Sequence, residues 1–101
     1  MSQNTQNPYF WTLDGDGSKT SQLEVVGATF ISIYNNPSTS GVGDDSTEIA
    51  NSETGQSINL PIGCVMDLSP DRGNTLQTLV IIPNGSNTTY VTMFGGTAKL
   101  I

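Results

Sequence analysis

The chain has 101 residues and a net charge of −6, with three basic residues, one cysteine and no histidine. Nucleic acids and anionic membranes are bound largely through Lys and Arg, so we expect neither as a partner. General acid–base catalysis relies mainly on histidine or on paired carboxylates, so we also expect no enzymatic activity.

Apolar residues make up 35% of the sequence and charged residues only 12%. The apolar residues are grouped in short runs, which is typical of a folded chain rather than a disordered one. The length fits one domain. No apolar stretch approaches the roughly 20 residues of a membrane span.

The first eight residues are polar and uncharged and end at Asn7-Pro8. They have neither a basic start nor an apolar block, so we expect no secretory signal. We predict an extended N-terminal arm over residues 1–8 and a single β domain over residues 9–101. The arm is either a frayed terminus or a segment that becomes ordered on a partner.

Tyr9-Phe10-Trp11 is the most aromatic stretch and opens a predicted strand from Tyr9 to Leu13. Exposed aromatic side chains serve as interface anchors or as platforms for sugar rings, and packing into the core is the alternative. We therefore treat these three residues as candidate interface residues.

Asp14-Gly15-Asp16-Gly17-Ser18 resembles the start of a calcium loop, because hard cations bind several clustered oxygen ligands. The sixth position of an EF-hand loop would be Gly and is Lys19; the twelfth would be Glu and is Val25. A glycine-rich turn is the alternative interpretation. Asp14 and Asp16 are the candidate metal ligands, with Ca²⁺ as the cation, and we expect no other cofactor.

The run from Gln22 to Tyr34 is the longest predicted strand, with Gly27 as a bulge. It has apolar residues of both parities, so one face meets the core and the other meets a second sheet or another subunit. The polar segment from Asn35 to Gly55 follows, with a short strand near Thr47. Long loops are often functional, so we add Asn35, Asn36 and Pro37 to the candidate interface residues.

The later apolar runs alternate or are two-sided, and strong turn sequences separate them. We predict strands over residues 62–68, 76–82, 89–94 and 97–101. Cys64 alternates with Met66 and Leu68, which predicts a small buried side chain. Leu79–Ile82 is apolar on both faces, which predicts a central strand.

These features predict an all-β fold: an antiparallel β-sandwich, jelly roll or small barrel of about six to eight short strands. From Thr75 to Ile101 there is one charged residue, Lys99. Strand edges with so few charges aggregate unless they are covered. We therefore expect the chain to self-associate or to dock on a larger assembly.

The C-terminal half resembles the small β-sandwich structural proteins of tailed bacteriophages, especially capsid decoration (cement) proteins. The resemblance covers about 45 residues. It lies in Ser57-Ile58-Asn59-Leu60-Pro61-Ile62-Gly63, Leu76-Gln77-Thr78-Leu79-Val80-Ile81-Ile82 and Tyr90-Val91-Thr92-Met93-Phe94-Gly95-Gly96.

The resemblance implies a virion structural protein made in the host cytoplasm and placed on the capsid exterior. It implies a homotrimer that contacts the major capsid protein or other virion proteins and stabilises the assembled shell by bridging its subunits. The alternative is a carbohydrate-binding or adhesive β-module, for example part of a phage tail fibre.

Overall fold

The computed structural model describes residues 7–15 and 21–101. In these residues it contains nine β-strands and no helix. The strands are β1 (Pro8–Asp14), β2 (Leu23–Val26), β3 (Phe30–Asn36), β4 (Thr47–Asn51), β5 (Ser57–Leu60), β6 (Val65–Leu68), β7 (Leu79–Pro83), β8 (Thr88–Phe94) and β9 (Thr97–Leu100).

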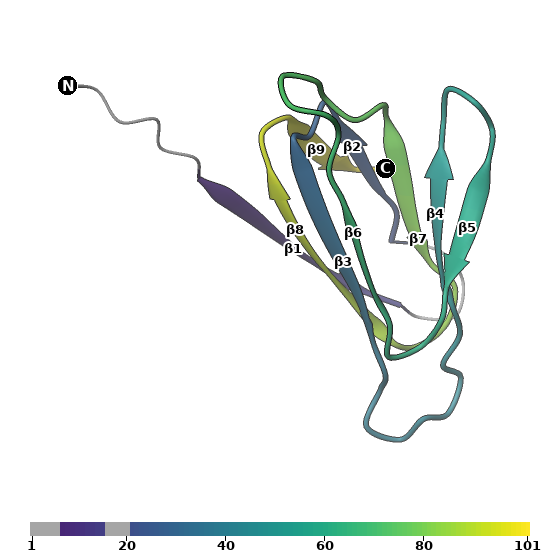
Figure 1. Cartoon of the computed structure of the whole chain (residues 1–101). Coiled ribbons are helices and arrows are strands. Elements are labelled where there is room, and N and C mark those ends of the chain that lie inside the picture. Colours follow the sequence, from purple (N-terminus) through teal and green to yellow (C-terminus); the bar gives the residue numbers. More distant parts are fainter. Residues whose placement is uncertain (1–6, 16–20) are drawn as a thin grey trace.

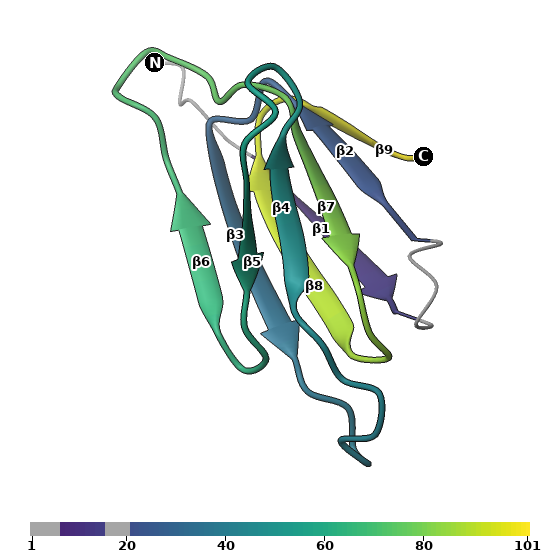
Figure 2. The same ribbon diagram turned by 90° about the vertical axis from the view of Figure 1, so that its right-hand side faces the viewer.

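The strands form two antiparallel sheets that face each other as two layers (Figures 1 and 2). The first sheet has the order β1-β8-β3-β6, and the second has the order β5-β4-β7-β2-β9. This confirms the predicted all-β sandwich, although the described residues contain nine strands where about six to eight were expected.

The core lies between the sheets and consists of alternate residues of the facing strands. Its fully buried apolar side chains include Ile31, Ile33 and Val91 from the first sheet, and Leu23 and Ile81 from the second. Burial alternates along β3, β7 and β8, as expected for strands with one face on the core.

The predicted strand from Gln22 to Tyr34 is two strands in different sheets, so the bulge interpretation was wrong. β2 pairs with β7 and β9, whereas β3 pairs with β6 and β8. Gly27 has a φ of 70°, a conformation that side chains with a Cβ rarely adopt, and it lies where the chain leaves the second sheet for the first.

Cys64 is exposed, which corrects the prediction of a buried thiol. The alternating pattern runs from Ile62 to Leu68, but only Val65–Leu68 form strand β6. The preceding residues form a turn in which the Cys64 N–H donates to Pro61 O at 3.2 Å. This turn removes Cys64 from the core face.

Other predicted elements agree more closely with the structure. The short strand near Thr47 is β4, and β7 is the central strand of the second sheet. β7 begins at Leu79 rather than Leu76, whose N–H donates to Ala28 O at 2.8 Å instead. β1 begins at Pro8, which the prediction had assigned to the arm.

Two buried asparagines tie the sheets together at one end of the sandwich. Asn87 Nδ2 donates to Asn35 Oδ1, and Asn35 Nδ2 donates to Leu60 O at 3.0 Å and to Asp45 O at 3.1 Å. Asn87 Oδ1 accepts from Asp45 N at 3.0 Å. The network joins β3 to the end of β5, which belongs to the other sheet.

Candidate functional site

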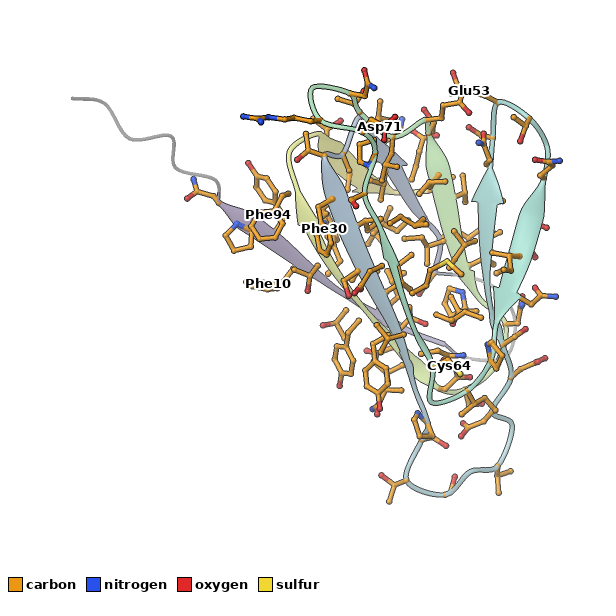
Figure 3. The ribbon with its side chains drawn as sticks, in the orientation of Figure 1. Phe10, Phe30, Glu53, Cys64, Asp71 and Phe94 are labelled. Atoms are coloured by element: carbon orange, nitrogen blue, oxygen red, sulfur yellow. The ribbon has the colours of Figure 1, made fainter. Side chains whose placement is uncertain are left out.

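The outer face of the first sheet carries a cluster of aromatic side chains. Residues that point away from the core on β1, β3 and β8 include all three Phe and two of the three Tyr of the chain. They are Phe10, Phe30, Tyr34, Tyr90 and Phe94. We call this surface the aromatic face, and Figure 3 shows its three Phe residues on the side away from the second sheet.

The strand register brings four of these rings together in pairs. Phe30 lies opposite Phe94, with ring centroids 5.9 Å apart and planes tilted by 56°. Tyr34 lies opposite Tyr90, with centroids 6.3 Å apart and nearly parallel, stacked planes. Such cross-strand pairs stabilise a sheet by up to about 1 kcal/mol, yet Tyr90 remains 43% exposed.

Phe10 is the most exposed ring of the aromatic face, at 73%. It lies on β1, which is an edge strand because it pairs with β8 alone. Opposite it on β8 stands Thr92 rather than another ring. A large apolar side chain in this position has little to contact within its own sheet, which is typical of an interface anchor.

Tyr9 and Trp11 have the opposite orientation and line a cleft at the side of the sandwich. Together with Met93, Thr97 and Ala98 they border a cavity of about 240 Å³ between β1 and β9. Trp11 also packs against the core. The three adjacent aromatic residues are therefore divided between the aromatic face and this cleft.

The candidates that follow β3 are not all available to a partner. Asn35 is completely buried and fully engaged in the asparagine network, so the prediction that it contacts a partner was wrong. Asn36 is half-buried at the end of β3, opposite Thr88. Pro37 is exposed in the following loop, so it remains a candidate.

Asp14 is exposed at the end of β1, where its Oδ1 accepts from Thr88 Oγ1 at 3.2 Å. Asp16 lies outside the described residues, so the calcium site stays a prediction. Within residues 7–15 and 21–101, no three His, Cys, Asp or Glu side chains are grouped in a way that could hold a metal ion.

Sequence reasoning selected Phe10 but missed the other four members of the aromatic face. Their signal was present, because Phe30 and Tyr34 have the opposite parity to the core residues Ile31 and Ile33. What the sequence could not provide was the adjacency of β3 and β8, whose paired residues are more than 50 positions apart.

Comparisons with protein-family models, curated protein sequences and solved structures found no match. Among the described residues, no helix has the length and apolar character needed to cross a membrane.

Proposed function

We propose that this protein is a structural component of a virion that binds the assembled capsid shell and stabilises it by bridging subunits. The observation that carries the proposal is the aromatic face, a surface rich in rings on a chain with few charges. Exposed apolar surface of this kind marks binding sites on soluble proteins. The resemblance to capsid decoration proteins supplies the identity of the partner.

Phe10 is the proposed anchor on the shell. A ring that is 73% exposed in the free protein loses water contact when it enters a pocket of a neighbouring subunit. A protein that binds only the assembled shell stabilises that assembly by mass action. No covalent chemistry is part of this role, which is consistent with a chain that has no histidine.

The test is co-sedimentation of the purified protein with shells assembled from the major capsid protein of the same genome. We expect Phe10→Ser to weaken binding about thirtyfold, equivalent to about 2 kcal/mol for one anchor residue. Val26→Ser is the matched control, because Val26 is an exposed apolar residue on the second sheet. Equal binding by Phe10→Ser and the wild type would contradict the proposal.

The arm has a separate test. β1 begins at Pro8, so deleting residues 1–6 leaves the strand intact, whereas a deletion through Trp11 would remove part of the sheet. If the arm clamps a neighbouring subunit, the shorter deletion weakens shell binding without changing the thermal unfolding of the free protein. Unchanged binding would confine the contact to the folded domain.

A carbohydrate-binding or adhesive module is the second candidate, and the Tyr9–Trp11 cleft favours it. Aromatic walls with a nearby hydroxyl, here Thr97, suit the apolar face and polar rim of a sugar ring. A glycan array checks this candidate. Hits lost in a Trp11→Ala variant would support it, and an array without hits would remove it.

A further inference from the structure

One cross-strand row of the aromatic face is polar. The register aligns Phe10, Thr92, Ser32 and Asp67 across β1, β8, β3 and β6. We call the last three residues the polar row. The Phe30–Phe94 pair lies on one side of it and the Tyr34–Tyr90 pair on the other. The row therefore has hydroxyls between rings and an exposed carboxylate at its β6 end.

The chemistry of the polar row suits an arginine side chain. A guanidinium group stacks on aromatic rings and forms two parallel hydrogen bonds with a carboxylate. In the described part of the chain, Asp67 has no ion-pair partner. A flat sugar is less suited, because Tyr34 and Tyr90 stack on each other and do not form one coplanar platform.

The chain itself contains one arginine, Arg72, whose guanidinium is available for such a contact. Lys99 pairs with Glu24 on the second sheet, whereas Arg72 has no ion-pair partner among the described residues. Arg72 is exposed in the turn closed by Asn74 N–H donating to Asp71 O at 2.9 Å. Asp71 marks this turn at the upper end of the sandwich in Figure 3, with Phe94 and Phe30 below it.

Arg72 lies beside the aromatic face of its own copy, because Arg72 and Phe30 line the same surface hollow of about 420 Å³. Asp67 and Arg72 form no ion pair within the chain. The carboxylate and the guanidinium are thus both available to a second copy.

We propose that Arg72 of one copy binds in the polar row of the next copy and pairs with Asp67 there. This inference rests on the proposed function, because it names the contact between copies in the homotrimer that the resemblance to decoration proteins implies. The contact pairs the turn of one copy with the polar row of the next, and such head-to-tail contacts close into a ring when the rotation allows it. The β1 side of the aromatic face, with Phe10, is left free for the shell.

The test exchanges the two charges and measures mass in solution by sedimentation equilibrium over a range of concentrations. We expect the wild type to form a trimer. Asp67→Arg or Arg72→Asp should each weaken association at least tenfold, because each variant places like charges together. The double variant restores opposite charges and keeps the net charge of −6, so it should associate as the wild type does.

Glu53→Arg is the matched control, because it makes the same charge change as Asp67→Arg at an exposed residue outside the first sheet. It should leave the trimer intact. Asp67→Asn keeps the side-chain shape and should weaken association in the same direction. A monomeric wild type, or a folded double variant that stays monomeric, would overturn the inference. Shell binding by Phe10→Ser is measured separately, so the two proposals can fail independently.

Discussion

The outer faces of the two sheets differ in what lies next to their apolar side chains. On the second sheet, the aliphatic side chains of Val80 and Ile82 lie directly across from Glu24 and Glu48. Long charged side chains cover apolar neighbours with their stems and keep their charges in water. On the first sheet, the rings of β3 lie across from rings of β8, and Phe10 of β1 lies across from Thr92. Charged side chains thus cover part of the outer face of the second sheet, which still exposes Val26, whereas no charged residue lies across from the rings of the first sheet.

This difference would mean little if the first sheet were only loosely attached. The asparagine network argues against that explanation, because it fixes the end of β3 to β5 of the other sheet. Buried polar groups that are fully hydrogen-bonded specify one arrangement of the elements they join. The aromatic face is therefore presented by a firmly held sheet.

The largest expected effect is the loss of stability when the asparagine network between the sheets is broken. Asn87→Ala leaves the buried Asn35 Oδ1 and the Asp45 N–H without the partners that Asn87 provides. Each unsatisfied buried group costs about 1–3 kcal/mol, so we expect a loss of about 3 kcal/mol in the free energy of unfolding. Urea denaturation followed by circular dichroism measures it. Asn59→Ala, at an exposed position of β5, is the control and should change stability by less than about 0.5 kcal/mol. Equal stabilities would show that the network does not hold the sheets.

The limits of the sequence prediction follow from the same network. The all-β class, β4 and the central position of β7 were predictable because alternation and turn residues act locally. Asn35 was assigned to an exposed loop because its sequence neighbours, Asn36 and Pro37, favour turns. Its burial depends on Leu60 and Asn87, which are 25 and 52 residues away. The aromatic face was hidden for a similar reason, since it depends on which strands are adjacent.

A second prediction compares the two short crossings between the sheets. Gly27 and Gly96 both have positive φ, but a Cβ on Gly27 would meet nothing within 4 Å. A Cβ on Gly96 would clash with the backbone oxygen of Val26 and lie 2.7 Å from Ala28 N. We expect Gly27→Ala to cost about 1 kcal/mol, from backbone strain alone. Gly96→Ala should cost about 1 kcal/mol more than that, because backbone must move. Thermal and urea unfolding of the two variants side by side gives the difference, and similar losses would show that the β8–β9 crossing can relax.

The smallest expected effect on stability concerns the charges that protect the second sheet. Lys99 Nζ lies 3.6 Å from Glu24 Oε1, and the Lys99 side chain is 74% exposed. An exposed ion pair contributes about 0.5 kcal/mol or less, so Lys99→Met should hardly change the free energy of unfolding. Its effect should appear instead in solubility, because Lys99 is on edge strand β9 and lysine at an edge opposes strand pairing between molecules. Light scattering measured against concentration should show more aggregation for Lys99→Met than for the wild type. Lys99→Arg keeps the charge and should show no increase. If Lys99→Met stays as soluble as the wild type, charge on this edge is not what keeps the second sheet from pairing with other molecules.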